Sequence, residues 1–226
     1  MSAVFESIEA LVFDFDGTLI DASIPVCRSF NAALEQFGVA PLEEEAVRRL
    51  IGTPLRGMFA TVLPEATEQE LDELIDAYRV FFLPLGCSDS RPMPGLQSML
   101  KHFHPRVKLG IATSRAADGA RLILEHMGLL DRFAAVVGIY EVTHAKPHPE
   151  PVLQALARMH VSPPHAVMVG DVPYDMEAAR QAGVHAVGLV SELYPAEALR
   201  AAGADAVIRS LDELIELVSV AASAGG

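Results

Sequence analysis

The chain has 226 residues, 51% of them hydrophobic, and a formal net charge of −13. Its length suits one main domain with a smaller insertion, and its apolar content suffices for a well-buried core. The acidic balance argues against a nucleic-acid partner, because phosphate backbones attract basic surfaces, although a bound metal ion can still attract a small anionic substrate. The N-terminal stretch has neither a basic region nor a long apolar run, so we expect no secretory signal, no membrane association and a cytoplasmic location.

Short apolar runs without polar alternation indicate strands that are buried on both faces of a sheet. In chain order these runs cover residues 10–13, 107–112, 134–139, 166–169 and 186–190, with a weaker run at 206–208. Helical patterns alternate with them at residues 96–103, 116–127, 149–159, 174–182 and 196–201. This alternation predicts an α/β fold, a doubly wound parallel sheet with helices on both faces.

The segment from residue 21 to about residue 90 interrupts this alternation. It contains helical patterns at residues 26–37, 43–50 and 54–63, and a fourth that runs from Thr67 to about residue 82. Thr67 and Glu70 form a capping-box pattern at the start of the fourth helix, and several prolines and glycines follow its end. We therefore predict a helical cap domain, residues 21–90, inserted into a core domain made of residues 1–20 and 91–226.

Polar side chains follow four of the predicted strands. They are Asp14 and Asp16, then Thr113 and Ser114, then Lys146 in a loop, and finally Asp171 and Asp175. Ligands of open parallel sheets bind beyond the carboxyl ends of the strands, so we expect these groups to converge. Carboxylates suit Mg²⁺, and hydroxyl and ammonium groups suit phosphoryl oxygens. Each pattern alone is common in turns, helix caps or solvated loops, but their joint placement predicts a shared metal and phosphate site.

The segments that carry these residues are FDFDGTLID, IATSR, AKPHPEP and VGDVPYDMEAARQAG. In this order they resemble the four motifs of the haloacid dehalogenase superfamily, and the resemblance covers essentially the whole chain. It implies a doubly wound α/β core with a mobile cap. Together with the cap segment IGTPLRGMF, the motifs are most similar to the branch that contains phosphoglycolate phosphatases and inorganic pyrophosphatases.

The resemblance also implies a covalent mechanism for phosphoryl transfer. Asp14 would be the nucleophile that forms an aspartyl-phosphate, and Asp16 the general acid and base. Mg²⁺ would be held by Asp14, by the backbone carbonyl of Asp16 and by Asp171. The related dehalogenases lack an acid at the position of Asp16, so its presence favours phosphoryl transfer over carbon–halogen cleavage.

Five further residues receive roles from the resemblance or from their chemistry. Thr113, helped by Ser114, would bind a phosphoryl oxygen. Lys146 would neutralise the transferring group and the nucleophile, and Asp175 would orient Lys146 or a water at the metal. In the cap, Arg56 offers a planar fork for a carboxylate or a second phosphate, although a solvated helix position explains it equally well.

The leading hypothesis is a phosphatase, acting as a monomer or homodimer on a small phosphorylated metabolite such as phosphoglycolate. Alternatives are an inorganic pyrophosphatase, a phosphomutase similar to β-phosphoglucomutase, and a non-catalytic binding protein. The mutases usually read Asp-Gly-Val in the first motif, where this chain has Asp16, Gly17 and Thr18, and the intact acids argue against a non-catalytic protein.

Histidines are expected to play no chemical part. His102 and His104 form one pair, and His144 and His148 flank Lys146. A zinc site needs closely matched ligands, and neither pair has an evident third nitrogen or sulfur ligand. The sequence therefore predicts solvated surface histidines at these positions.

Overall fold

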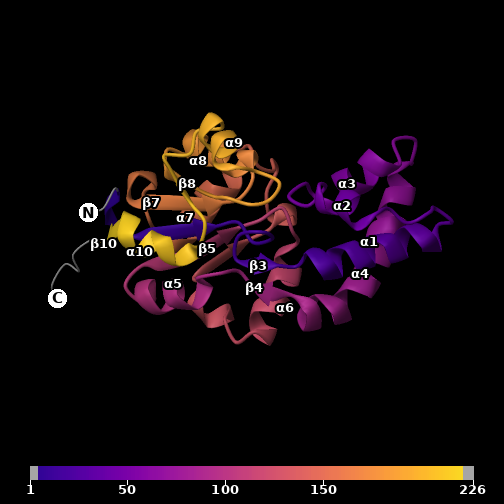
Figure 1. Cartoon of the computed structure of the whole chain (residues 1–226), viewed down its shortest axis with the longest axis horizontal. Coiled ribbons are helices and arrows are strands. Elements are labelled where there is room, and N and C mark those ends of the chain that lie inside the picture. Colours follow the sequence, from indigo (N-terminus) through magenta and orange to yellow (C-terminus); the bar gives the residue numbers. More distant parts are fainter. Residues whose placement is uncertain (1–4, 221–226) are drawn as a thin grey trace.

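The computed structural model describes residues 5–220 and has two parts, an α/β core and a helical cap beside it (Figure 1). The core contains a six-stranded sheet in which all neighbours are parallel, with the order β6-β5-β2-β7-β8-β9. Its strands are β2 (Ala10–Phe13), β5 (Lys108–Ala112), β6 (Ala135–Val137), β7 (Ala166–Gly170), β8 (His185–Leu189) and β9 (Ala206–Ile208). The doubly wound sheet predicted from the sequence is thereby confirmed.

Successive residues of β2 enter two different hydrophobic cores. Ala10 and Val12 pack with α7 (Glu150–Met159), α8 (Pro173–Ala182) and α9 (Ala196–Ala201). Leu11 and Phe13 pack with α5 (Leu96–Phe103), α6 (Ala117–His126) and α10 (Leu214–Leu217) on the other face. All four side chains are fully buried. The uninterrupted apolar character of the strand follows from this burial on both faces.

The cap consists of four helices, which are α1 (Ser23–Gln36), α2 (Glu44–Arg48), α3 (Leu55–Val62) and α4 (Glu68–Asp89). The rings of Phe30 and Phe59 stack between α1 and α3 with centroids 4.4 Å apart. The predicted capping box opens α4: the Thr67 hydroxyl accepts a hydrogen bond from the Glu70 N–H, and the Glu70 carboxylate accepts one from the Thr67 N–H. Buried side chains from all four cap helices belong to the same hydrophobic cluster as Leu11 and Phe13 of the core.

A short antiparallel ribbon joins the two parts. It pairs β3 (Ile20–Asp21) with β4 (Arg91–Pro92), where the chain leaves the core and where it returns. The domain boundaries at residues 20/21 and 90/91 remain a proposal, which this ribbon supports.

The structure extends the prediction at two places. Helix α4 continues through Pro84 to Asp89, beyond the predicted end near residue 82. A proline removes the hydrogen bond to the carbonyl four residues earlier, and that carbonyl belongs to Val80, a residue that is 69% exposed. A second parallel pair, β1 (Phe5–Ile8) with β10 (Val218–Val220), was not predicted. Short 3₁₀ helices cover Leu130–Arg132, Ile139–Glu141, Pro163–His165 and Leu211–Glu213.

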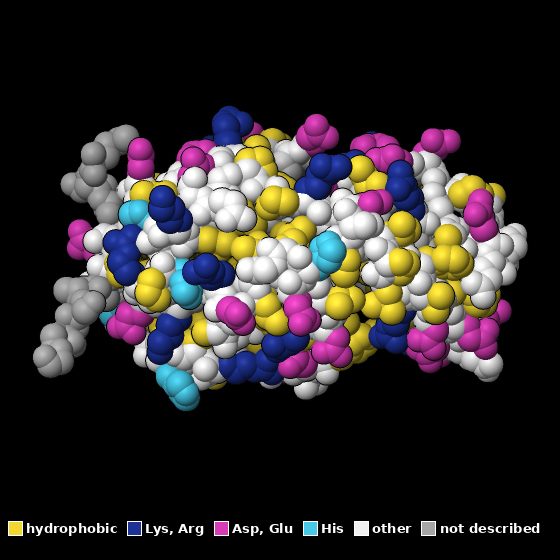
Figure 2. Space-filling model, turned by 90° about the horizontal axis from the view of Figure 1, so that it is seen from below, with side chains coloured by type: hydrophobic (Ala, Val, Ile, Leu, Met, Phe, Trp, Pro, Cys, Tyr) yellow, Lys and Arg dark blue, Asp and Glu magenta, His cyan; other side chains and the backbone are white. Residues whose placement is uncertain are grey.

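The surface carries acidic and basic side chains side by side, and hydrophobic ones gather over the cap half of the face in Figure 2. The exposed apolar residues of the neighbouring helices include Val80 and Leu83 of α4 and Leu122 of α6. Across residues 5–220, none of the helices combines the length and the hydrophobicity needed to cross a membrane.

Candidate active site

Four predicted site residues meet at the carboxyl edge of the sheet. Asp14 follows β2 directly, and its amide hydrogen bonds to the carbonyl of Val169 on the neighbouring strand. The Lys146 ammonium donates to Asp14 Oδ1 over 2.8 Å and to Asp175 Oδ1 over 2.6 Å. All three side chains are at most 5% exposed. The Asp175 carboxylate also accepts a hydrogen bond from the Val172 N–H, which fixes it at the start of α8.

Asp171 completes this cluster from the end of β7. Its Oδ1 accepts a 2.7 Å hydrogen bond from the Thr18 hydroxyl, within the loop that follows Asp14. Gly17 lies between them with φ +85°, and a Cβ there would be 2.4 Å from Asp171 Oδ2. Only glycine accepts both this positive φ and this close approach. Gly17 therefore allows the loop that follows Asp14 to lie against Asp171.

The buried cluster carries an excess of negative charge. Burial raises the pKa of Asp14 to about 7; Lys146 acts in the opposite direction, and Asp175 raises this pKa further. Burial, then the charges of Asp14 and Asp175, raises the pKa of Asp171 well above its usual range. Burial alone would lower the pKa of Lys146, but both aspartates outweigh it and raise that pKa. Three carboxyl groups thus share one ammonium.

This arrangement fits a divalent cation. One oxygen from each of Asp14, Asp171 and Asp175 lies within 4.8 Å of the other two. An ion would supply the missing positive charge, and an all-oxygen donor set is the one that Mg²⁺ prefers. Both carboxylate oxygens of Asp175 accept hydrogen bonds, whereas Asp14 and Asp171 each accept one through Oδ1 alone, so Asp14 and Asp171 are the side chains best placed to hold it.

Asp16 is held by Arg115. The guanidinium makes two 2.8 Å hydrogen bonds, from Nε and Nη2 to the two carboxylate oxygens. It also lies over the Phe82 ring, 4.4 Å from its centroid. Burial would lower the pKa of Arg115, but the Asp16 charge and Tyr78 raise it. The two hydrogen bonds from Arg115 therefore fix the orientation of the Asp16 carboxylate.

A pocket of about 760 Å³ opens above these residues, between core and cap. Asp14, Asp16, Thr113 and Ser114 line its floor. Thr113 Oγ1 accepts a hydrogen bond from the Arg115 N–H, so its own hydroxyl hydrogen is left to donate into the pocket. Neither hydroxyl caps α6, whose N-cap is Ala116 without a side-chain hydrogen bond. The placement agrees with the phosphate-binding part expected of Thr113 and Ser114.

Arg56 also lines the pocket, but its guanidinium is already paired within the cap. Nη1 donates to Glu68 Oε2 over 2.7 Å, and Nη2 donates to Asp72. Its side chain is 41% exposed. A substrate carboxylate would have to displace one of these acids, which lie one turn apart on α4.

Two contacts of the site were missed by sequence reasoning. The Arg115 pairing with Asp16 joins residues 99 positions apart, and the Thr18 contact with Asp171 joins residues 153 positions apart. Arg115 stands directly after the Thr-Ser pair at a strand end, and this adjacency was the signal that could have drawn attention to it.

The geometry agrees with a comparison of the sequence with known families. The profile described as Haloacid dehalogenase-like hydrolase matches residues 11–189. The chain therefore belongs to the haloacid dehalogenase-like hydrolase family. The match spans every strand-end residue of the site, from Asp14 to Asp175.

Similar proteins support the same assignment. Pyrophosphatase PpaX of Anoxybacillus flavithermus is 30% identical over 215 residues, which are 95% of this chain and 98% of that protein. A phosphoglycolate phosphatase of Xylella fastidiosa is 34% identical over 175 residues, 77% of this chain and 76% of its own. The crystal structure of a hydrolase from Pseudomonas syringae superposes with a TM-score of 0.80 at 27% identity, covering 93% of this chain and all (100%) of that one. The chain described here is therefore an enzyme, and it has the fold of these hydrolases along nearly its whole length.

Proposed function

We propose that the protein is a Mg²⁺-dependent phosphatase that hydrolyses a small phosphorylated metabolite through an aspartyl-phosphate on Asp14. The observation that carries this proposal is the buried contact of Lys146 with both Asp14 and Asp175, next to a pocket that Asp14 and Asp16 line. A cytoplasmic location and a monomeric or homodimeric state belong to the same proposal.

The first half of the reaction transfers the phosphoryl group to the enzyme. An oxygen of Asp14 bonds to phosphorus while the bond from phosphorus to the leaving oxygen breaks. Lys146 remains an ammonium because its pKa is raised, so it holds Asp14 Oδ1 and offsets negative charge on the transferring group. Thr113 and Ser114 donate to phosphoryl oxygens at the pocket floor.

Asp16 moves the protons in both halves. In its acid form it gives a proton to the leaving oxygen, and as a carboxylate it then takes a proton from the water that attacks phosphorus and releases Asp14. The two hydrogen bonds from Arg115 hold the carboxylate over the pocket. Hydrogen bonds to a charged acceptor are the stronger ones, so the bonds from Arg115 weaken when Asp16 carries the proton.

The metal would be held by Asp14, the backbone carbonyl of Asp16 and Asp171. When bound, Mg²⁺ supplies the positive charge that offsets the repulsion between a carboxylate nucleophile and a phosphate dianion. Thr18 fixes Asp171 through its 2.7 Å hydrogen bond, and this contact orients the carboxylate before an ion arrives.

The pocket walls favour an organic leaving group over a second phosphate. The arginines that line it are already paired: Arg56 with two cap acids, Arg79 with Asp76 and the Tyr140 hydroxyl, and Arg115 with Asp16. The rest of the lining is largely apolar, including Val26, Ile51, Leu55, Met58, Phe82, Leu83, Leu122 and Ile139. An apolar wall stabilises carbon surface and gives a charged leaving group little compensation. We therefore rank organic phosphate monoesters ahead of pyrophosphate, and we place phosphoglycolate, which has a carbon portion but also a carboxylate, between them.

Pyrophosphatase activity is the second candidate, and its support is the name of the PpaX relative. Phosphate release should be measured with phosphoglycolate, pyrophosphate, sugar phosphates and an aryl phosphate, with wild type and Asp14→Asn side by side. Mg²⁺-dependent release from monoesters that Asp14→Asn abolishes is the expected outcome. Release from pyrophosphate alone would favour the second candidate, and isomerisation of a sugar phosphate without release would favour a mutase. A wild type that binds these compounds without turning them over would contradict the proposal.

A further inference from the structure

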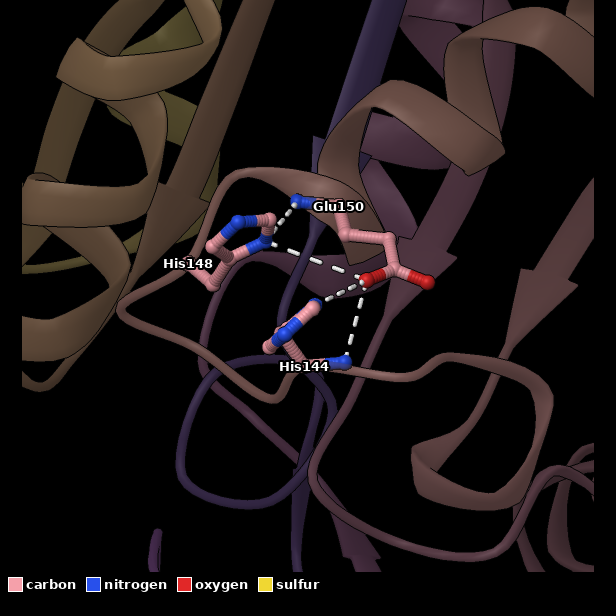
Figure 3. Close-up of side chains that lie close together, drawn as sticks. All are labelled: His144, His148 and Glu150. Carbon is pink, nitrogen blue, oxygen red and sulfur yellow. Dashed lines mark hydrogen bonds and ion pairs between the residues drawn. The ribbon is translucent and has the colours of Figure 1, made fainter.

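A second cluster of metal-binding side chains lies outside the pocket. His144, His148 and Glu150 come from the loop that leads into α7, and their side chains point toward one another (Figure 3). His144 Nδ1 is 3.0 Å from Glu150 Oε2, and His148 Nδ1 is 3.9 Å from the same oxygen. The two imidazole rings lie 4.5 Å apart between centroids. Two ring nitrogens therefore converge on one carboxylate oxygen.

These spacings are close to what a small tetrahedral ion requires. Ligand atoms about 2.0–2.2 Å from such an ion are about 3.3–3.6 Å from each other. The two nitrogen-to-oxygen distances, 3.0 and 3.9 Å, lie on either side of this value. The side chains of His144 and His148 are 60% and 47% exposed. Each ring can therefore turn enough to move its nitrogen by the few tenths of an ångström needed.

The carboxylate at the centre is held in place by backbone. Glu150 Oε1 accepts a 2.7 Å hydrogen bond from the Thr143 N–H, and Oε2 accepts a 3.0 Å bond from the His144 N–H. A carboxylate has about four lone-pair positions, so it can keep both bonds and still coordinate an ion. His148 Nδ1 accepts a 3.2 Å bond from the Glu150 N–H. Its ring must release that bond or turn to present Nε2.

We propose that His144, His148 and Glu150 form a binding site for a divalent transition-metal ion, with Zn²⁺ the best match. Two imidazoles and one carboxylate are a common zinc donor set, with a water as the fourth ligand. Mg²⁺ strongly prefers oxygen ligands, so the two sites sort metals: the aspartate cluster takes Mg²⁺ and the histidine cluster takes the softer ion. From the sequence we predicted only solvated histidines here, because we looked for a nitrogen or sulfur atom as the third ligand and not for a carboxylate.

The site would clamp the loop that carries Lys146. His144 and His148 stand two residues to either side of Lys146, whose ammonium reaches Asp14 and Asp175. An ion that binds the folded loop and not the unfolded chain stabilises the fold by mass action. Zn²⁺ should therefore raise the melting temperature, and this effect should not depend on catalysis.

The test is a Zn²⁺ titration of the full chain by calorimetry, with Mg²⁺ at a saturating concentration to occupy the aspartate cluster. The wild type should bind one Zn²⁺ per chain. The double variant His144→Ala/His148→Ala should bind it at least about tenfold more weakly, which corresponds to about 1.4 kcal/mol. The matched control is His102→Ala/His104→Ala, the other pair of closely spaced histidines, which should bind Zn²⁺ as the wild type does. His148→Gln, a milder change on an exposed residue, should give an intermediate loss.

Two further readouts separate this site from the catalytic one. The Zn²⁺-induced rise in melting temperature should disappear in His144→Ala/His148→Ala and persist in Asp171→Asn. Mg²⁺-dependent turnover without Zn²⁺ should be the same in the double variant and the wild type. Equal Zn²⁺ affinity in wild type and double variant, or loss of binding in Asp171→Asn with retention in the double variant, would overturn the proposal. So would a wild type that binds no Zn²⁺ at micromolar concentrations.

Discussion

Replacing Lys146 with methionine removes the ammonium that lies between Asp14 and Asp175. Its side chain is 3% exposed, and those of its partners are 5% and 0% exposed. Removing one member of a buried ion pair costs about 3–5 kcal/mol, because the remaining charge stays buried without compensation. Asp14 has a pKa raised to about 7 and can take up a proton once Lys146 is gone. This relief places the expected loss of stability near the lower end, at about 3 kcal/mol.

The loss should be measured by thermal unfolding with and without Mg²⁺. For a chain of this size, 1 kcal/mol corresponds to about 2–4 °C, so we expect the Lys146→Met melting temperature to fall by about 6–12 °C without metal. An ion that displaces the proton from Asp14 restores the positive charge lost with Lys146, so added Mg²⁺ should stabilise the variant more than the wild type. Turnover should fall by at least about 100-fold, as for the loss of a group that stabilises transition-state charge.

Lys108→Met is the matched control. Lys108 donates a 2.7 Å hydrogen bond to the Met159 carbonyl, which is a neutral acceptor. Lys108 begins β5, so it lies at the opposite end of the sheet from the site. Its replacement should cost about 1 kcal/mol and leave turnover and the Mg²⁺ response unchanged. A Lys146→Met protein with wild-type stability, or one that Mg²⁺ stabilises no more than the wild type, would refute the charge balance described for the cluster.

Four further outcomes follow from the site. Asp14→Asn should abolish turnover and leave the melting temperature at or above that of the wild type; near-normal activity would exclude covalent catalysis. Asp16→Asn should slow both halves, and a quench during turnover should detect phosphoryl-enzyme; an unchanged pH–rate profile would contradict its assignment. Chelation should abolish activity and Ca²⁺ should inhibit, because its looser shell can engage both oxygens of Asp14; activity in metal-free enzyme would oppose this. Arg56→Ala should change KM by less than about threefold for phosphoglycolate and an aryl phosphate alike, since exposed pairs contribute little; a loss confined to phosphoglycolate would show that Arg56 leaves its cap acids for the substrate.

The fold was largely predictable because its signals are local. A strand buried on both faces needs an apolar run, and Ala10–Phe13 satisfies this within four residues. The capping box at Thr67 and Glu70 is likewise a contact within one turn. Pairing of β1 with β10 joins residues more than 200 positions apart, and a four-residue strand such as Phe5–Ile8, with two polar residues in the middle, gives no periodic signal. The continuation of α4 past Pro84 depends on the exposure of Val80, which the sequence does not state.

The candidate site likewise has residues that could be predicted from the sequence and contacts that could not. Asp14, Lys146, Asp171 and Asp175 were expected together because each follows a strand of one parallel sheet. The partners of Arg115 and Arg56 were not, since a long side chain can reach several acids and only packing selects among them. The Glu150 contact with His144 and His148 depends on a loop that folds back on itself, held by hydrogen bonds from the Thr143 and His144 amides.

The stereochemical course at phosphorus tests the covalent role of Asp14 most directly. An accepted monoester that carries an isotopically chiral phosphate group is hydrolysed, and the configuration of the released phosphate is determined. Each in-line displacement inverts phosphorus, so transfer to Asp14 followed by attack of water predicts net retention. Net inversion would mean that water attacks the substrate directly, and it would contradict the aspartyl-phosphate mechanism proposed for this protein.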